Sequence, residues 1–207
     1  YTRVTGKPSV IITAPGPGTI NVLPALANAL ADGSPVVALG TSTHLVDRQL
    51  GTFQEMDQVR LMEPATKWAA QLTHPHRIAE YMSIAFRHAM TPPYGPVYLD
   101  LPADVVEQGP LVDEEQARLP VKYRTESRAH GDPALVKEAI GLLKQAQKPL
   151  VFAGSGVFWA NASAELQEFI NAIQDDREPL TTGEDGRRAM AVAQAAANDL
   201  DLPLFQY

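Results

Sequence analysis

A turn rich in glycine and proline holds the first residues of this sequence whose types could do chemistry. The segment Thr13–Asn21 reads Thr-Ala-Pro-Gly-Pro-Gly-Thr-Ile-Asn and connects an apolar run to an alanine-rich stretch. Glycines allow backbone to approach a ligand closely, prolines stiffen a turn, and the first turn of a helix offers unpaired N–H groups. The turn therefore suits ligand binding, although an ordinary connection between a strand and a helix has the same pattern. It lacks the third glycine of the Gly-x-Gly-x-x-Gly dinucleotide fingerprint.

A second candidate segment, Gly51–Gln58, concentrates amides and carboxylates. It reads Gly-Thr-Phe-Gln-Glu-Met-Asp-Gln, and its polar side chains can donate or accept several hydrogen bonds. Taken alone, a solvated turn explains these residues equally well. The segment Pro64–Trp68 follows, in which a surface charge explains Lys67 and a core position explains Trp68.

Composition excludes several other kinds of site. The 207 residues include no cysteine, so disulfides and thiolate metal sites are ruled out, and we expect a reducing compartment such as the cytoplasm. A net charge of −7 without a long basic run argues against nucleic acid or a membrane surface as partner. No apolar stretch approaches the roughly 20 residues needed to span a bilayer. The histidines fit no metal-ligand pattern, and we expect surface or capping roles for His44, His74, His76, His88 and His130.

Alternating strands and helices must position the two candidate segments. Apolar runs predict strands at Ser9–Ile12, Pro35–Leu39 and Pro96–Leu101. We expect the first of these strands to be buried on both faces. A helix is predicted over Thr19–Asp32, where Pro24 interrupts or restarts it, and a second one where apolar residues recur from Ile78 to Ala89. Residues 41–66 predict a long loop with short helical pieces. Units of this kind predict a parallel sheet with helices on both faces.

A second unit is predicted after a polar linker over residues 108–131. Asp132 is a good N-cap, and Pro133 suits the first position of a helix. A strand at Pro149–Ala153 and a turn at Gly154–Gly156 follow. A further helix is predicted from the spacing of Leu166, Phe169, Ile170 and Ile173, and the composition of Ala191–Ala197 is helical. The predicted fold class is therefore α/β, with two consecutive and incomplete domains over residues 1–107 and 132–207.

Taken in order, the motifs of the first unit resemble one enzyme family. The motifs are Tyr-Thr-Arg-Val-Thr-Gly-Lys-Pro at the start, Gly16-Pro17-Gly18 with Asn21, Gly51-Thr-Phe-Gln-Glu55, Thr66-Lys67-Trp68 and Gly95-Pro-Val-Tyr-Leu-Asp-Leu-Pro102. They resemble the pyrimidine-binding domain of the acetolactate synthase-like enzymes, which depend on thiamine diphosphate. The resemblance covers residues 1–107. Residues 132–187 are similar to the start of the family's central domain, and from about Arg188 onward no similarity is visible.

The resemblance implies a lyase or a transferase that forms or breaks carbon–carbon bonds with thiamine diphosphate and Mg²⁺. It implies that Pro17, Gly18 and Asn21 line the cofactor pocket. Phe53 and Gln54 would face the reacting end, where Gln54 would hydrogen-bond substrate, and Lys67 is a weaker candidate for a substrate contact. The implied substrates are small acyl-CoA or 2-oxo acid molecules. Because the family's active site lies between subunits, a homodimer or homotetramer is also implied.

Two parts of the family's catalytic machinery are not found in this sequence. The glutamate that binds the cofactor's pyrimidine ring precedes the Tyr1 motif in the family, so we expect a chain whose beginning is missing and which alone is inactive. The metal ligands belong to a C-terminal domain, and Glu184-Asp185-Gly186 only superficially resembles their motif. The segment Phe53–Gln58 is most similar to 2-hydroxyacyl-CoA lyases and oxalyl-CoA decarboxylases. Acetolactate synthase remains an alternative function, and a truncated non-catalytic α/β binding module is an alternative of another class.

Overall fold

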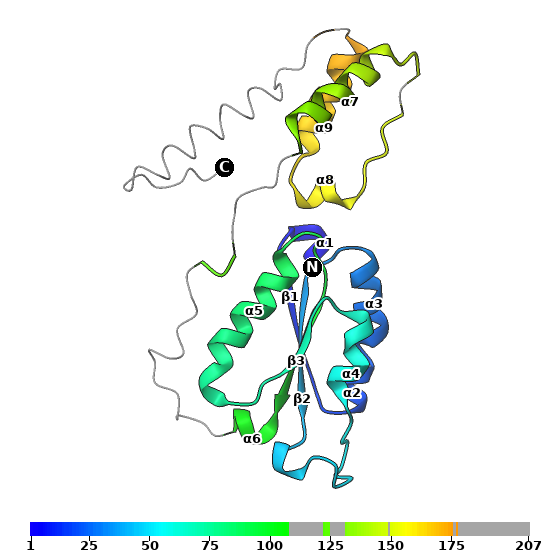
Figure 1. Ribbon diagram of the computed structural model, residues 1–207. Coiled ribbons are helices and arrows are strands. Elements are labelled where there is room, and N and C mark those ends of the chain that lie inside the picture. The colour runs from blue at the N-terminus through cyan, green and yellow to red at the C-terminus, as the bar shows by residue number, and fades with distance from the viewer. Residues whose placement is uncertain (108–121, 125–130, 149, 176, 178–207) are drawn as a thin grey trace, which may run out of the picture. The chain divides into compact units, whose positions relative to one another are not determined.

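The chain forms two units in the computed structural model, Tyr1–Glu126 and Ser127–Tyr207, and each is described by itself (Figure 1). The structure describes residues 1–107, 122–124, 131–148, 150–175 and 177. The predicted linker over residues 108–131 lies largely outside the described residues, as do Glu184–Gly186 and the predicted helix at Ala191–Ala197. Within the described residues, no helix is both long enough and apolar enough to cross a membrane.

The first unit is built on a parallel sheet of four strands in the order β1-β2-β4-β3. The strands are β1 (Ser9–Thr13), β2 (Val36–Ser42), β3 (Ala69–Gln71) and β4 (Val97–Pro102). The three strands predicted from apolar runs are confirmed. β3 was not predicted, because three residues reading Ala-Ala-Gln show neither a periodicity nor an apolar run. The parallel α/β architecture of this unit is therefore confirmed.

Helices cover both faces of the sheet. One face packs on α5 (Ile78–Met90), and the other packs on α3 (Leu23–Ala31) and α4 (Gln58–Met62) (Figure 1). Alternate residues of the central strand β2 serve the two faces, since Val37 joins the cluster under α5 and Ala38 joins the cluster under α3. β2 is buried along almost its whole length, as expected for a central parallel strand.

The edge strand β1 departs from the expectation of burial on both faces. Val10 is 49% exposed and Ile12 is 71% exposed, whereas Ile11 packs against the core. β1 pairs with β2 alone, so Val10 and Ile12 lie at the open edge of the face that α5 covers further in, over their buried partners Val37 and Leu39. The apolar run predicted the strand correctly, but it could not distinguish an edge position from a central one.

The predicted helix over Thr19–Asp32 is divided in two. A short helix α2 (Pro17–Ile20) is followed by α3, and Pro24 occupies the first turn of α3. A proline has no N–H to donate, and only the first turn of a helix needs no such donor. The structure therefore confirms that Pro24 restarts the helix.

Short helical pieces interrupt the connections of the first unit, including residues 41–66, where they were predicted. They are α1 (Thr2–Thr5), η1 (Leu45–Asp47), η2 (Glu63–Ala65), η3 (Pro75–Arg77) and α6 (Ala103–Val106), where η denotes a 3₁₀ helix. The segment from Thr43 to Asp57, between β2 and α4, contains η1 as its one helical element and is called the long loop below. It begins at the carboxyl end of a central strand, which is where α/β proteins carry their binding residues.

The second unit contains α7 (Pro133–Gln145), α8 (Ser155–Trp159) and α9 (Ser163–Gln174) among its described residues. The predicted N-cap is confirmed, because the Asp132 carboxylate accepts the Ala134 N–H at 2.7 Å. The predicted strand at Pro149–Ala153 is not formed over residues 150–153, where Phe152 is 96% exposed. A strand needs a neighbour to pair its backbone groups, and the described residues of this unit offer none.

Candidate functional site

The two candidate segments meet at the carboxyl edge of the sheet. The turn Ala14–Gly18 leaves the end of β1, and the long loop leaves the end of β2. Because all four strands are parallel, these ends lie on the same edge, where ligands bind in open α/β sheets. The structure thus brings together two candidate segments, the first of which ends at Asn21 and the second of which begins at Gly51.

Gly16 is the point of contact between the turn and the long loop. This buried residue has φ 59° and ψ −113°, a conformation open to glycine but not to other residues. A Cβ at this position would lie 2.7 Å from the backbone oxygen of Gln54 and 3.0 Å from its Cβ. The turn and the loop are therefore packed so closely that the sequence requires glycine here.

Gln54 and Phe53 lie at the tip of the long loop. Gln54 has φ 62°, which is unusual for a residue with a side chain and marks a constrained backbone. The Phe53 side chain is 86% exposed, and that of Gln54 is half-buried. Both residues predicted to face the reacting end are therefore held at the sheet edge with surface available for a ligand.

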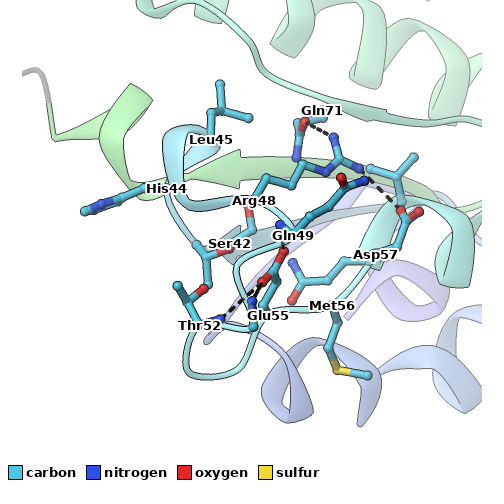
Figure 2. Close-up of a pocket in the computed structure, with 14 residues that line it drawn as sticks. Ser42, His44, Leu45, Arg48, Gln49, Thr52, Glu55, Met56, Asp57 and Gln71 are labelled. Carbon is cyan, nitrogen blue, oxygen red and sulfur yellow. Dashed lines mark hydrogen bonds and ion pairs between the residues drawn. The ribbon is translucent and has the colours of Figure 1, made fainter.

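The Glu55 carboxylate holds the loop in this shape. It accepts backbone N–H groups from Gln49, from Gly51 at 2.8 Å and from Thr52 at 3.2 Å (Figure 2). These hydrogen bonds, the one from Gln49 above all, lower the pKa of Glu55 below its ordinary value. Because its oxygens are engaged with the loop backbone, Glu55 acts as a structural anion and not as an acid for catalysis.

The three predicted cofactor-binding residues share one short structural element. Pro17 and Gly18 begin α2, and Asn21 ends it, so all three lie next to the Gly16 contact. Pro17 and Asn21 are exposed, and Gly18 is half-buried. The buried Thr19 fixes the element from below, since its hydroxyl lies 2.9 Å from that of Thr13 and 3.0 Å from the carbonyl oxygen of Ala14.

A buried carboxylate, Asp100 on β4, lies beneath the two segments. It is 1% exposed and accepts hydrogen bonds of 2.7–2.8 Å from four uncharged donors, which are Gln58 Nε2, the Tyr98 hydroxyl, Ser42 Oγ and Gln71 Nε2. Burial, together with the neighbouring negative charge of Asp100, raises the pKa of Tyr98 well above its ordinary range. Tyr98 therefore stays protonated and remains a donor to Asp100.

Gln58 connects this carboxylate to the turn. Its side chain is buried, and its Oε1 accepts the Gly16 N–H at 2.5 Å. Its Nε2 lies 2.7 Å from Asp100 Oδ1 and 3.0 Å from the Thr41 carbonyl oxygen. Sequence analysis placed Gln58 within a candidate segment but gave it no role at the site. No local signal singles it out, because α4 also contains the exposed polar residue Arg60.

A cavity of about 580 Å³ lies between the long loop and the strand ends (Figure 2). Ser42, Arg48, Glu55, Gln58 and Gln71 are among its lining residues. Arg48 is anchored there by a hydrogen bond of 3.2 Å to Gln71 Oε1. None of the predicted site residues (Pro17, Gly18, Asn21, Phe53, Gln54 and Lys67) is among the residues that line this cavity.

Lys67 is the predicted site residue that the structure does not bring to the others. It precedes β3 and lies at the amino end of the parallel strands, opposite the carboxyl edge. Its Nζ donates to the carbonyl oxygens of His88 at 2.6 Å and Thr91 at 2.7 Å, at the end of α5. Burial lowers the pKa of Lys67. The geometry assigns it to capping α5 and does not support a substrate contact.

Residues of the turn at Gly16 form a candidate surface for a cofactor ring. Among the described residues, no cluster of three or more histidines and carboxylates could hold a metal ion. Pro17, Gly18 and Asn21 offer surface that suits a flat heteroaromatic ring, and Gln54 lies beside the adjoining Gly16. The Glu55 carboxylate accepts backbone N–H groups of the long loop, and the Glu80 carboxylate forms an ion pair with Arg77 at 2.7 Å. Neither is therefore placed to exchange a proton with such a ring.

Comparison with known proteins identifies the family of the chain. Residues 1–61 match the family "Thiamine pyrophosphate enzyme, N-terminal TPP binding domain". The chain is 31% identical to a probable acetolactate synthase large subunit from Methanocaldococcus jannaschii, over 98% of this chain and 36% of that protein. It is 35% identical to oxalyl-CoA decarboxylase from Escherichia coli K12, over 86% of this chain and 32% of that protein. It is 30% identical to 2-hydroxyacyl-CoA lyase from Arabidopsis thaliana, over 82% of this chain and 30% of that protein.

The chain spans about a third of the length of these relatives. The matched family region contains the Gly16 turn, the long loop and Gln58, so it includes both segments that meet at the sheet edge. The resemblance inferred from the motifs is confirmed. The chain belongs to the superfamily of thiamine-diphosphate-dependent enzymes that includes acetolactate synthase, oxalyl-CoA decarboxylase and 2-hydroxyacyl-CoA lyase.

Proposed function

We propose that this chain supplies part of the pyrimidine-binding half-site of an enzyme that breaks or forms carbon–carbon bonds, most like a 2-hydroxyacyl-CoA lyase. The observation that carries the proposal is the contact between the Gly16 turn and Gln54 at the carboxyl edge of the sheet. This contact places the α2 residues beside an amide that can hydrogen-bond a substrate. When bound, thiamine diphosphate supplies the carbon nucleophile and accepts the electrons of the broken bond.

The residues of the chain have separate roles in this proposal. Pro17, Gly18 and Asn21 hold the pyrimidine ring by packing and polar contact. The Gln54 amide orients the substrate oxygen, and Phe53 excludes water from the reacting end. The ligands of the Mg²⁺ ion that accompanies the cofactor would lie outside the described residues.

Subunit assembly and location are part of the same proposal. The long loop exposes Val46, Leu50 and Phe53, and such apolar surface suits an active site completed by a second subunit. A homodimer or homotetramer would bury it. The absence of cysteine supports a cytoplasmic location.

The choice of a 2-hydroxyacyl-CoA lyase rests on Phe53–Gln58, whose sequence Phe-Gln-Glu-Met-Asp-Gln is most similar to that group. Acetolactate synthase is the second candidate. The probable acetolactate synthase large subunit from Methanocaldococcus jannaschii aligns with 98% of this chain and the acetolactate synthase from Arthrospira platensis with 97%, whereas the 2-hydroxyacyl-CoA lyase aligns with 82%. Incubating the whole enzyme with a 2-hydroxyacyl-CoA or with pyruvate separates them. Release of an aldehyde supports the lyase, and formation of acetolactate supports the synthase.

Gln54→Ala tests the role of the loop tip. Because Gln54 is proposed to contact the substrate and not the pyrimidine ring, we expect turnover to fall about tenfold to a hundredfold, with cofactor affinity changed less than about threefold. Steady-state kinetics with saturating cofactor, together with calorimetric titration, measure the two effects. Unchanged turnover in this variant would remove Gln54 from the site.

A further inference from the structure

We propose that Gln58 is a positioning residue that locks the Gly16 turn against the long loop, with Asp100 as its buried anchor. The inference rests on the proposed function, because the turn and the loop carry the proposed cofactor and substrate contacts. Gln58 itself touches neither ligand in this account. Its effect passes through the backbone N–H of Gly16 and the backbone of Gln54.

The Gly16 N–H is closed off from solvent. This group is buried, and its partner is the Gln58 side chain at 2.5 Å. A buried N–H that loses its partner costs about 1–3 kcal/mol, so the backbone would move to find another acceptor. The conformation of the turn therefore depends on one side chain from the start of α4.

Asp100 fixes the orientation of the Gln58 amide. A side-chain amide has an acceptor and a donor end, and Asp100 accepts from four neighbours and cannot donate when ionised. Asp100 therefore requires the Nε2 end of Gln58, which directs Oε1 toward Gly16. A rotated amide would set an oxygen against the carboxylate and an NH₂ group against the Gly16 N–H. Asp100 thus selects the one orientation that holds the turn.

The turn and the loop are in close contact. There is no space between Gly16 and Gln54, since even a Cβ at Gly16 would lie 2.7 Å from the Gln54 oxygen. Movement of Gly16 must therefore displace Gln54, whose φ of 62° already marks a constrained backbone. One hydrogen bond at Gln58 accordingly sets the relative position of the proposed cofactor-binding turn and of the proposed substrate-binding amide.

The test compares Gln58→Met with Ser42→Ala in the whole enzyme. Both substitutions remove one donor to Asp100, but only the first removes the acceptor of the Gly16 N–H. The exchange rate of the Gly16 amide hydrogen measures this loss directly. Pro15 and Pro17 have no N–H, so Gly16 carries the single exchangeable amide of the tripeptide Pro15–Pro17. We expect exchange at Gly16 to accelerate by at least about tenfold in Gln58→Met and to stay unchanged in Ser42→Ala.

Cofactor affinity is the second measurement. We expect the dissociation constant for thiamine diphosphate to rise about tenfold in Gln58→Met and less than about twofold in Ser42→Ala. A role confined to general stability would lower the melting temperature of both variants without this difference. Equal affinity in wild type and Gln58→Met, or unchanged exchange at Gly16, would overturn the inference.

An exchange of partners keeps the test decisive if Gln58→Met does not fold. Gln58→Glu retains the acceptor for Gly16 but sets two carboxylates against each other, so Gly16 protection should be lost. Adding Asp100→Asn restores one carboxylate and one amide with their positions exchanged, and protection should return. If protection of the Gly16 amide does not recover in the double variant, the proposed positioning role of Gln58 is contradicted. Failure of the wild-type enzyme to bind thiamine diphosphate would instead overturn the proposed function, and the Gly16 exchange would still decide whether the lock exists.

Discussion

At the scale of single residues, the molecule relies on side chains that fix backbone and do not themselves meet a ligand. Gln58 joins the Gly16 N–H to Asp100 across 42 sequence positions. Glu55 has a comparable role inside the long loop, where its carboxylate accepts hydrogen bonds from the N–H groups of Gln49, Gly51 and Thr52. The side chains of Gln58 and Glu55 are each oriented by fixed hydrogen-bond partners, and together they hold Gln54 at the loop tip.

The Glu55 contact predicts a titration of the loop in acid. A carboxyl group whose pKa is lowered by folding stabilises the folded loop above its unfolded value, and the contribution disappears as the pH falls through the lowered pKa. The shape of the loop should therefore persist at pH 4.5, the ordinary value for this group, and be lost below it. The amide proton shift of Gly51, followed by NMR as a function of pH, reports the apparent pKa.

Glu55→Gln is the matched control for that titration. It keeps the size of the side chain and removes the charge, so the acid transition of the Gly51 amide should vanish and the amide should exchange faster at neutral pH. A titration midpoint at or above 4.5 in the wild-type protein would contradict the role assigned to Glu55.

Single-residue roles were only partly predictable from the sequence. Gly16 and Gln54 belong to segments that sequence analysis selected, and the structure places them in contact. Their dependence on Gln58 and Asp100 was not predictable, because those partners come from different elements and meet only through the sheet. Lys67 shows the converse. Its motif is shared with the family, but the end of the strand on which it lies is decided by the parallel pairing of β3 with β4.

At the scale of elements, the sheet edge gathers the ends of β1 and β2 with the turn and loop that follow them. The turn is short and stiffened by Pro15 and Pro17, whereas the long loop is held by internal hydrogen bonds. The contact at Gly16 joins these two elements. A side chain at that position should therefore disturb both of them.

Gly16→Ala tests this junction, with Gly6→Ala as control. Both glycines have positive φ, 59° and 70°, but a Cβ at Gly6 meets nothing within 4 Å. Gly6→Ala should cost about 1 kcal/mol of unfolding free energy from the backbone conformation alone. Gly16→Ala adds the collision with Gln54, for a total of about 2–4 kcal/mol. Urea denaturation measures both losses, and equal losses would show that the turn and the loop are not in close contact.

Strands and helices were predicted correctly where the local sequence pattern was strong. The apolar runs gave β1, β2 and β4, and Pro24 marked the restart at α3. The three residues of β3 carry no pattern, and their pairing with β4 creates the strand. In the second unit the pattern at residues 150–153 predicts a strand, but the described residues contain no neighbour that would satisfy its backbone.

At the scale of the whole molecule, the first unit is a parallel α/β unit of a thiamine-diphosphate-dependent superfamily, and the proposed half-site would use its exposed sheet edge. The predicted residues Phe53, Asn21 and Pro17 are exposed at the sheet edge. The described residues offer no cluster for a metal. The parallel sheet was predictable from the alternation of strands and helices, whereas the strand order β1-β2-β4-β3 was not, because nothing local specifies it.

Calorimetric titration of the whole enzyme with thiamine diphosphate and Mg²⁺ tests the central claim most directly. We expect a saturable heat with a dissociation constant on the order of 1 μM, weakened about tenfold by Gly16→Ala through the displaced turn and loop. The absence of binding heat would contradict the proposed cofactor site and leave a non-catalytic α/β module as the better account. Binding that is indifferent to Gly16→Ala would show that the cofactor does not use this edge of the sheet.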